Sequence, residues 1–357
     1  MTVPETMYAM VLTGHGGLDK LEWQETVPVP NPGPGEVLIR ISASSVNNTD
    51  INTRTAWYSK SVRGATKADV ATDDTDAVAA DGSWSGTPLS FPRIQGADCC
   101  GSIVAVGTGV DAARTGERVL VRALQLVAAP DGSQATQTFG SECDGGFAEY
   151  AVARSGDALI VNADWSDAEL ASIPCAYSTA EGMLQRVSLG AERVLVTGAS
   201  GGVGSAAIQL AKRRGATVTA MTNADKADAV RDLGADAIVG RDDPFAPGSF
   251  DVVVDLVAGP RWPEMIDALR SGGRYVTAGA IAGPIVELDV RTLYLRDLTL
   301  YGSTAQPDNV MTDLIGYIER GEIRPVIAGE FALKDLHRAQ EAFLSKRHIG
   351  KIVIRNR

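Results

Sequence analysis

The fold is decided by the stretch Val194-Leu-Val-Thr-Gly-Ala-Ser-Gly-Gly-Val-Gly204. It passes directly from an apolar run of strand type into a helical pattern that begins near Ser205. Glycines at such a junction permit a tight turn, a close approach of the backbone to a phosphate group, and close packing of the helix on a sheet. The first N–H groups of the helix add partial positive charge. The stretch therefore predicts a cradle for the pyrophosphate of a dinucleotide, formed by Ala199, Ser200, Gly201, Gly202 and Val203.

The residues after Ser166 alternate between helical patterns and short apolar strands, which is typical of a parallel sheet. The glycine pattern is relaxed, because Ala199 stands in the first place of the strict G-x-G-x-x-G form, and alone it also fits an ordinary glycine-rich turn. Further strand candidates weaken that alternative. The expected strands are Arg193–Thr197, Thr217–Met221, Ala237–Gly240, Asp251–Val257, Arg274–Ala278 and Leu298–Gly302, with helices at Ser205–Arg214 and Lys226–Leu233. The fold class is therefore α/β, with a doubly wound parallel sheet over residues 161–305.

The N-terminal part, residues 1–160, has the pattern of a β domain. Short β-type runs such as Glu36–Ile41 are separated by turns rich in proline and glycine. Residues 61–90 are poor in large apolar side chains, so we expect a long surface loop or a short irregular insert there. A second polar loop covers residues 130–146. Residues 306–357 are expected to add two helices and the strand Lys351–Ile354.

Composition excludes several classes of function. A formal net charge of -11 opposes binding to a phosphate backbone, and no Lys/Arg cluster offsets it. No apolar run approaches the ~20 residues that cross a bilayer. The segment Met1–Met10 also lacks the layout of a signal peptide. We therefore expect a cytoplasmic protein that acts on a small molecule and binds neither nucleic acid nor a membrane.

The chain has few residues of the types that bind zinc. They are His15, His337, His348, Cys99, Cys100, Cys143 and Cys175. Tetrahedral zinc needs several such ligands at one point, and no C-x-x-C pair occurs. Cys99 and Cys100 are adjacent, so they point to opposite faces if that segment is a strand. The cysteines are therefore expected to be reduced core residues, and no metal site is predicted.

The end of the second strand distinguishes NADH from NADPH in a sheet of this kind. A carboxylate there binds the ribose hydroxyls and repels a 2′-phosphate. Here the strand ends in Thr222 and Asn223, and the cations Lys226 and Arg241 follow the second and third strands. Two cations favour the phosphorylated form through charge-assisted hydrogen bonds, unless both are solvated surface residues. The sequence therefore predicts NADPH, or NADP+ when oxidised, as the cofactor.

Several motifs resemble the medium-chain dehydrogenase/reductase superfamily over nearly the whole chain. They are Pro34-Gly-Glu-Val-Leu-Ile39, Gly96-Ala-Asp-Cys-Cys-Gly-Ser-Ile-Val-Ala-Val-Gly107, Gly116-Glu-Arg-Val119, Asp144-Gly-Gly-Phe-Ala-Glu-Tyr150, Ser178-Thr-Ala180 and Gly350-Lys-Ile-Val353, besides the glycine stretch. The resemblance implies a GroES-like β catalytic domain, a Rossmann domain, and a tail that returns to the catalytic domain. It also implies a homodimer, with Leu298–Gly302 as a candidate pairing edge. The resemblance further implies that the cofactor is contacted by Thr179, Ala278, Gly279 and Lys351.

Zinc-dependent members of this superfamily hold their catalytic metal with a Cys, a His and a later Cys. The matching positions here are Asn47, Ala97 and Cys175, and one ligand of three cannot hold the metal at useful affinity. The lobe that elsewhere carries structural-zinc cysteines corresponds to the loop before Phe147, which contains only Cys143. The resemblance therefore narrows to the zinc-free branch of quinone, alkenal and enoyl-thioester reductases.

The segment Val46-Asn-Asn-Thr-Asp-Ile-Asn-Thr-Arg-Thr-Ala-Trp-Tyr58 is similar to the enoyl-thioester reductase pattern, in which a Tyr lies eight residues after the Asp of an Asn-x-x-Asp-Ile-Asn run. Asp50 and Tyr58 keep this spacing. Asn48 replaces the usual Pro, and the insert at 61–90 is longer than expected. Both departures leave the substrate open.

The chemistry of such a reductase gives these residues roles. Hydride addition to a double bond conjugated to a carbonyl leaves negative charge on the oxygen, and a protonated Tyr58 could stabilise that charge and supply the proton. Asn47 could hold the carbonyl or the nicotinamide ribose, while Asp50 is expected to be a structural acceptor. The alternative for Tyr58 is an aromatic residue that caps the pocket beside Trp57.

The sequence thus favours a zinc-independent, NADPH-dependent reductase of activated C=C bonds, in enoyl thioesters or alkenals, or of quinones. A quinone oxidoreductase proper is the first alternative, because quinone reduction needs little precision in the proton donor. A non-catalytic NADPH-binding protein, similar to zeta-type crystallins, is the second. A zinc-type alcohol dehydrogenase is the enzyme that these residues support least.

Overall fold

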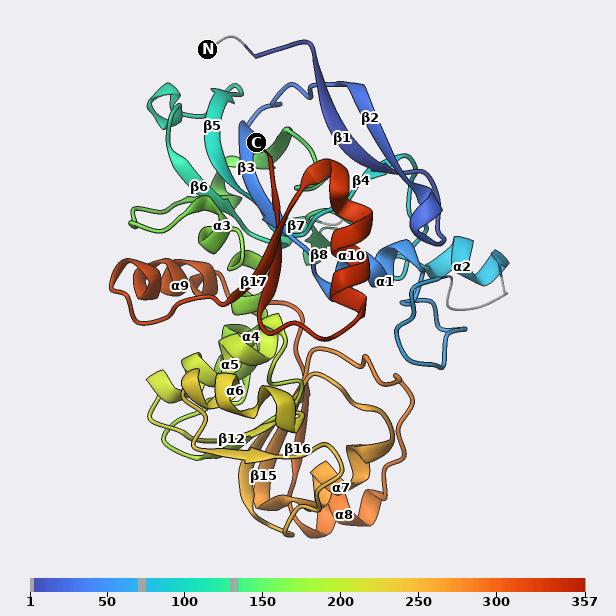
Figure 1. Cartoon of the computed structure of the whole chain (residues 1–357), viewed down its shortest axis with the longest axis vertical. Helices are drawn as coiled ribbons and strands as arrows, with labels where there is room; N and C mark the ends of the chain where they lie inside the picture. Colours follow the sequence, from blue (N-terminus) through green and yellow to red (C-terminus); the bar gives the residue numbers. More distant parts are fainter. Residues whose placement is uncertain (1–2, 70–74, 129–131, 133, 357) are drawn as a thin grey trace.

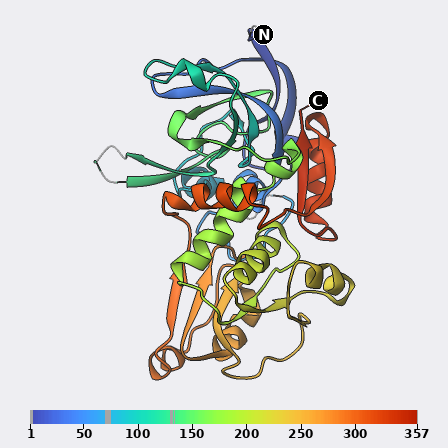
Figure 2. The ribbon, with the colours of Figure 1, turned by 90° about the vertical axis from the view of Figure 1, so that its left-hand side faces the viewer.

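Two lobes make up the structure, a computed structural model that describes residues 3–69, 75–128, 132 and 134–356. In Figure 1 the N-terminal strands and the C-terminal strand pair form the upper lobe, and the sheet that follows the glycine stretch forms the lower lobe. Figure 2 shows the same division from the side, with helix α4 (Pro174–Arg186) running between the lobes. Among the described residues, no helix has both the length and the apolar character that a membrane span requires.

The lower lobe contains a parallel sheet with the strand order β13-β12-β11-β14-β15-β16. Its strands are β11 (Arg193–Val196), β12 (Thr217–Met221), β13 (Ala237–Val239), β14 (Phe250–Asp255), β15 (Leu269–Thr277) and β16 (Thr299–Gly302). The first strand lies inside the sheet and the chain winds outward from it in both directions, which is the doubly wound arrangement. The strands that the sequence predicts here are confirmed, although β15 begins earlier than expected.

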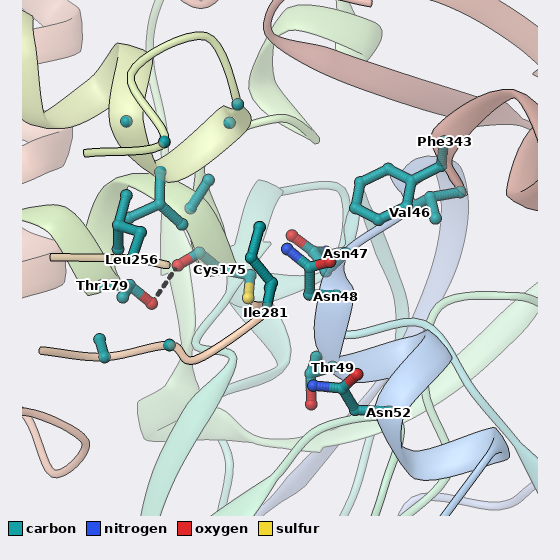
Figure 3. A pocket seen from close by; sticks show the side chains of 18 of the residues that line it. Val46, Asn47, Asn48, Thr49, Asn52, Cys175, Thr179, Leu256, Ile281 and Phe343 are labelled. Atoms are coloured by element: carbon teal, nitrogen blue, oxygen red, sulfur yellow. Dashed lines mark hydrogen bonds between the residues drawn. The ribbon is translucent and has the colours of Figure 1, made fainter. Parts of the chain in front are cut away.

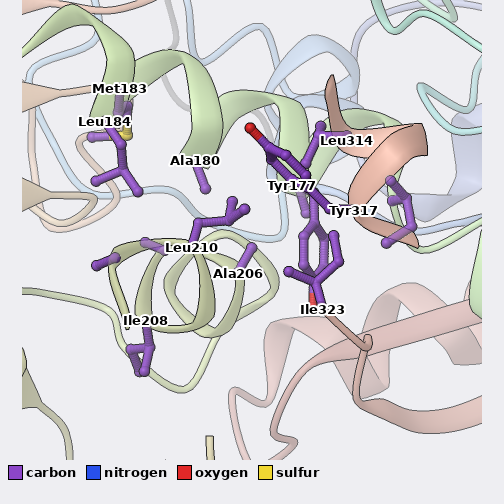
Figure 4. Packing of buried hydrophobic residues seen from close by; sticks show 14 of the residues in the cluster. Tyr177, Ala180, Met183, Leu184, Ala206, Ile208, Leu210, Leu314, Tyr317 and Ile323 are labelled. Atoms are coloured by element: carbon purple, nitrogen blue, oxygen red, sulfur yellow. The ribbon is translucent and has the colours of Figure 1, made fainter. Parts of the chain in front are cut away.

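Helices cover both faces of this sheet. On one face α4, α5 (Gly202–Arg213) and α9 (Asn309–Glu319) pack together, and Figure 4 shows Tyr177 and Ala180 of α4 beside the side chains of α5 and α9. Ala180 and Ala206 are fully buried, and their small size lets α4 and α5 approach closely. The other face packs against α7 (Trp262–Asp267). This packing fixes the start of α4 close to the glycine stretch.

The upper lobe is largely antiparallel. One sheet has the order β10-β6-β5-β3-β18-β17 with β9 beside β3, and smaller sheets are β2-β1-β4 and the hairpin β7-β8. The strands are β1 (Thr6–Leu12), β2 (Leu21–Pro28), β3 (Glu36–Ser45), β4 (Arg93–Ile94), β5 (Cys100–Val106), β6 (Arg118–Val121), β7 (Leu124–Ala128), β8 (Gln134–Thr138), β9 (Tyr150–Arg154) and β10 (Ala158–Ile160). Cys99 and Cys100 are buried in different core clusters, as expected for adjacent residues of a strand.

The remaining helices are short. They are α1 (Asn48–Arg54), α2 (Thr75–Asp81), α3 (Asp167–Leu170), α6 (Ala227–Asp232), α8 (Val290–Leu295) and α10 (Leu336–Leu344), with 3-10 turns at Leu18–Lys20, Ala112–Arg114, Ser155–Asp157, Ala224–Lys226, Gly259–Arg261 and Leu333–Asp335. The predicted helix at Lys226–Leu233 is therefore divided into a 3-10 turn and α6.

From β17 onward the tail returns to the upper lobe, as the resemblance implies, whereas α9 packs against the helices of the lower lobe. Strand β18 (Lys351–Arg355) pairs antiparallel with β3 and parallel with β17 (Ile327–Ala332), a strand that the sequence analysis missed. Just before β18, the Gly350 N–H donates to the Ser200 carbonyl at 2.9 Å. The C-terminal tail therefore joins the upper lobe directly to the glycine stretch.

The two polar loops are more ordered than expected. Within residues 61–90 the chain forms helix α2 and buries Val62 and Ser83, which are 4% and 0% exposed, so the prediction of a surface loop is wrong for these parts. The second loop contributes strand β8 to a hairpin. Residues 70–74, 130, 131 and 133 of these two segments lie outside the described residues.

Candidate active site

A cleft between the lobes brings together most of the residues that the sequence singles out. Of that set it is lined by Asn47, Tyr58, Thr179, Ser200, Gly201, Gly202, Val203, Lys226, Arg241, Ala278, Gly279 and Lys351. Figure 3 shows Thr179 and Leu256 on the side of the lower lobe, the asparagines at the start of α1 on the other side, and Ile281 between them. Residues from distant parts of the sequence thus face one space.

Three predicted cofactor residues lie outside the lining of the cleft: Ala199, Thr222 and Asn223. Ala199 is fully buried under the glycine turn, and Asn223 is exposed at the end of β12. Thr222 is 3% exposed, and its Oγ1 has no hydrogen-bond partner among the described residues. These positions support the turn and the strand end rather than the wall of the cleft.

The glycine turn has the close geometry that the sequence predicts. Gly198 has a φ of 58°, which an L side chain disfavours. A Cβ on Gly204 would lie 2.2 Å from the Gly198 carbonyl oxygen, so only glycine allows α5 to begin this close to β11. Gly201 and Gly202 expose backbone to the cleft at the N-terminus of α5. This geometry fits an anion such as a pyrophosphate.

Positive charge collects at one end of the cleft. The Lys226 ammonium donates to the carbonyls of Lys346 at 2.6 Å and His348 at 2.9 Å. Burial, and then the nearby Lys226, lowers the pKa of Lys346 to about 8. Burial, with Lys346 and Lys226 next, lowers the pKa of His348 to about 4, so this imidazole is neutral at neutral pH. Arg241 also lines this part of the cleft.

These cations fit an anionic ligand. Like charges held close together are costly unless a group of opposite charge lies between them. His348 also lines this part of the cleft, and its imidazole is bonded to the backbone of Ala342. Together with the glycine turn, this end of the cleft suits the phosphates of a dinucleotide. Lys346 and His348 were missed by the sequence analysis because they meet Lys226 only through the fold of the tail.

Asp98 is fully buried and accepts hydrogen bonds from several elements around the cleft. Its Oδ2 accepts from Lys351 Nζ at 3.0 Å, from Asn47 Nδ2 at 2.7 Å and from the Ser45 hydroxyl. Its Oδ1 accepts from the Cys175 N–H at 2.7 Å. Sequence reasoning gave Asp98 no role, although it lies inside one of the quoted motifs. The fold therefore uses this carboxylate to join β3, α4 and β18.

Asn47 is held in place by Asp98 and Lys351. Besides its contact with Asp98, its Oδ1 accepts from Lys351 Nζ at 2.5 Å, and its Nδ2 donates to the Ser45 carbonyl at 3.2 Å. Both polar atoms of the side chain thus have partners inside the protein. Asn48, Thr49 and Asn52, which the sequence analysis did not assign, add polar groups to the cleft from α1.

Asp50 is a buried acceptor at the start of α1. Its carboxylate accepts from the Asn47 N–H at 2.7 Å and from the Ala97 N–H at 3.2 Å. Burial raises its pKa to about 7, and the charge of Asp98 also contributes. These contacts fix the backbone of the two positions that correspond to metal ligands in the zinc-dependent members. The geometry fits the structural role expected for Asp50.

Tyr58 lies in the wall of the cleft after α1. Its hydroxyl donates to Thr49 Oγ1 at 3.2 Å. Burial raises its pKa to about 12, so the hydroxyl stays protonated at neutral pH. The ring packs edge-on against Trp57, with 5.8 Å between ring centroids. The geometry allows both a proton donor and an aromatic wall at this position.

Asn47, Ala97 and Cys175 stand at the positions that match metal ligands in the zinc-dependent members. Over the described ranges of the chain, no three His, Cys, Asp or Glu side chains are grouped so that they could hold a metal ion. Of the three matching positions, Asn47 is bonded to Lys351, Ala97 has no donor side chain, and burial raises the pKa of the Cys175 thiol.

Comparisons with known proteins agree with this architecture. The family model of the alcohol dehydrogenase GroES-like domain matches residues 33–163, and that of the zinc-binding dehydrogenases matches residues 202–320. An acryloyl-coenzyme A reductase of Metallosphaera sedula is 28% identical over 98% of this chain and 99% of its own length. A chloroplastic NADPH-dependent alkenal/one oxidoreductase of Arabidopsis thaliana is 26% identical over 99% of this chain and 80% of its own length.

A solved structure is closer in sequence. It is a protein of Sinorhizobium meliloti 1021 assigned only provisionally as an alcohol dehydrogenase, 44% identical, with a TM-score of 0.86, over 99% of this chain and 97% of its own. The similarity covers both lobes and the cleft between them. The chain therefore belongs to the medium-chain dehydrogenase/reductase superfamily and is an NAD(P)H-dependent oxidoreductase.

Proposed function

We propose that this chain uses NADPH, without zinc, to reduce C=C bonds conjugated to a carbonyl group, in enoyl thioesters or alkenals. One observation carries the proposal: the protonated hydroxyl of Tyr58 lines the same cleft as the glycine turn of the cofactor site. The names of the acryloyl-coenzyme A reductase and the alkenal/one oxidoreductase support the same class of substrate.

NADPH rather than NADH is supported by the charge of the cleft. No carboxylate ends β12, and Lys226, Arg241 and Lys346 line the neighbouring part of the cleft. Three cations stabilise a 2′-phosphate through charge-assisted hydrogen bonds. The aliphatic part of Lys351 lies beside the glycine turn, where a Cβ on Gly202 would be 2.6 Å from its Cδ, while its ammonium is bonded to Asn47 and Asp98. We assign the Lys351 side chain to the wall of the cofactor site.

The residues of the chain then perform the acid–base part of the reaction. The bound cofactor supplies the hydride. Tyr58 Oη, oriented by Thr49, can donate a hydrogen bond to the carbonyl oxygen of the substrate and stabilise negative charge that develops there. The same hydroxyl can supply the proton that completes the reduction. Asn47 holds Lys351 and Asp98 in place and thereby shapes the wall beneath the substrate.

A quinone is the second candidate substrate. Trp57, Tyr58 and Trp84 all line the upper part of the cleft, and flat aromatic side chains suit a flat ring. Quinone reduction also places little demand on the proton donor. The non-enzymatic alternative is a protein that binds NADPH but catalyses no reaction.

A substrate panel tests these possibilities. NADPH consumption is followed with a crotonyl thioester, crotonaldehyde and a benzoquinone, each with and without a chelator. We expect the highest kcat/KM with one of the conjugated carbonyl compounds and no effect of the chelator. Quinone turnover alone would favour the second candidate. NADPH binding without any turnover would contradict both.

We further propose that the protein is a homodimer. Strand β16 pairs only with β15 among the described strands, so its other edge is free for a second copy. The neighbouring α8 exposes Val290, Tyr294 and Leu295, which are 59%, 60% and 69% exposed. Exposed apolar groups beside a free edge are typical of an interface. Light scattering should give twice the mass of the chain, and Leu295→Glu should shift it toward the monomer.

A further inference from the structure

Residues 61–69, a described part of the 61–90 segment whose function the sequence leaves open, run from the upper lobe to the lower lobe beside the cleft. The Thr66 N–H donates to the Ile281 carbonyl at 3.1 Å, and the Thr66 hydroxyl donates to Asn52 Oδ1 at 3.1 Å. Asn52 belongs to α1 and Ile281 follows β15, and both line the cleft (Figure 3). Thr66 therefore spans the two lobes at the edge of the site.

The same segment places an aromatic side chain in the cleft. Trp84 is half-buried and lines the cleft together with Trp57 and Tyr58. Trp57 is itself tied to the segment, because its indole N–H donates to the Gly64 carbonyl at 3.0 Å. The three aromatic residues stand on the upper lobe, opposite the glycine turn. They therefore line the part of the cleft that the cofactor site leaves for the substrate.

The backbone on both sides of Trp84 is held in place. Before it, a Cβ on Gly82 would lie 2.8 Å from the Cβ of Ala56, so the chain packs closely against the residue that precedes Trp57. After it, the Ser85 N–H donates to Glu142 Oε1 at 3.0 Å. Glu142 Oε2 also accepts the Thr138 N–H at 3.0 Å, and Thr138 lines the cleft.

The turn that carries Trp84 is also braced from within. Ser83 is fully buried, and its hydroxyl contacts Ser85 Oγ at 3.0 Å and accepts the Thr87 N–H at 3.2 Å. These contacts fix the backbone that carries Trp84, so the indole projects from a turn with a defined position.

We propose that Trp84 is a specificity-determining residue, which closes the substrate end of the cleft and restricts the enzyme to activated alkenes with a short chain beyond the double bond. This inference rests on the proposed function and adds the size limit to it. Removing the indole should open room for further methylene groups. In an apolar pocket each methylene group changes kcat/KM by roughly 10–200-fold.

The test compares crotonaldehyde, hexenal and octenal as substrates of the wild type and of Trp84→Ala. The quantity measured is the ratio of kcat/KM for octenal to that for crotonaldehyde. We expect a wild type that prefers crotonaldehyde, and a ratio at least about tenfold higher in Trp84→Ala. Trp84→Phe keeps most of the wall and should give an intermediate ratio. It also keeps the test informative if the alanine variant folds poorly.

Trp23→Ala is the matched control. Trp23 lies on β2, is partly exposed, and bonds to Glu25 rather than to any residue of the cleft. Its ratio should equal that of the wild type. If the wild type reduces the aldehydes but neither Trp84 variant changes the ratio, Trp84 does not set substrate size and the inference fails alone. If the wild type reduces none of the aldehydes, the same ratio is measured with octenoyl and crotonyl thioesters. If it reduces neither class of substrate under saturating NADPH, the proposed function fails and the inference falls with it.

Discussion

The Lys351 ammonium and the Asp98 carboxylate form an ion pair in the interior, with 3.0 Å between Nζ and Oδ2 and with side chains that are 4% and 0% exposed. The pair lies among the positions that correspond to zinc ligands in related dehydrogenases. Lys351 thus brings a fixed positive charge to a place where those enzymes use a metal ion. Unlike a metal ion, which thiolate or imidazole ligands must hold, this positive charge belongs to a side chain of the protein.

Removal of one partner should therefore destabilise the fold strongly. Asp98→Ala leaves the buried Lys351 ammonium without its carboxylate, and loss of one member of a buried pair costs about 3–5 kcal/mol. The double variant Asp98→Ala, Lys351→Met should recover part of this loss, because no uncompensated charge remains. Urea unfolding of the wild type, both single variants and the double variant measures the coupling. Strict additivity of the single effects would show that the pair is not coupled.

The purified enzyme should need no zinc. Elemental analysis is expected to find zinc well below one ion per chain, because Asn47 and Ala97 stand where two ligands would be and only Cys175 of the three positions can bind the metal. Activity should survive dialysis against a strong chelator. A tightly bound zinc whose removal abolishes turnover would contradict this prediction.

The sequence was sufficient for the lower sheet and for the glycine turn because these depend on local patterns. Strands β11 to β16 are short apolar runs, and Gly204 meets a neighbour only six positions before it. The sequence indicated Lys226 and Arg241 but not the neighbouring Lys346 and His348. These two residues contact Lys226 from positions 120 and 122 residues away along the chain. The role of Asp98 was hidden for the same reason, because its partners lie on three separate elements.

The insert shows a different limit. Its polar composition correctly predicts few core residues, but packing against Ala56 and a bond to Glu142 order the turn around Trp84. Composition reports how much apolar surface a segment can bury, and it does not report which few contacts fix the segment. Tertiary contacts therefore decided its structure.

Arg241 should distinguish the two nicotinamide cofactors. Its side chain is exposed and lines the cleft, whereas the Lys226 ammonium also holds the Lys346 and His348 carbonyls. Arg241→Ala should weaken NADPH binding by about 1–3 kcal/mol, the range for a hydrogen bond to a charged group, and leave NADH almost unchanged. Lys226→Ala should show the same preference together with some loss of stability. Equal losses for both cofactors in isothermal titration would mean that these cations do not bind the 2′-phosphate.

NADPH binding should depend on pH through Lys346. The pKa of its ammonium in the free protein is about 8, lowered by burial and then by Lys226. A bound phosphate favours the charged form, so binding takes up a proton when Lys346 is neutral. Affinity should be constant well below pH 8 and fall by up to about tenfold per pH unit above it. His348, with a pKa of about 4, is neutral over this range and adds nothing. Lys346→Met should remove the dependence, and an unchanged profile in that variant would assign it to another group.

Tyr58 gives the sharpest test of the chemistry. Tyr58→Phe removes the hydroxyl that contacts Thr49 and keeps the ring that packs on Trp57, so the fold and NADPH binding should be retained. If Oη stabilises the developing negative charge or supplies the proton, kcat with an enoyl substrate should fall by about 10²–10³-fold. If Tyr58 only walls the cleft, the loss should be a few-fold and should appear mainly in KM. Thr49→Val keeps the hydroxyl and removes the partner that orients it, so its kcat should fall less than that of Tyr58→Phe. A Tyr58→Phe enzyme with nearly wild-type kcat would show that Tyr58 takes no part in the mechanism. If the variant still reduces a quinone at the wild-type rate but loses enoyl reduction, the cleft supports both reactions and only enoyl reduction needs the Tyr58 proton.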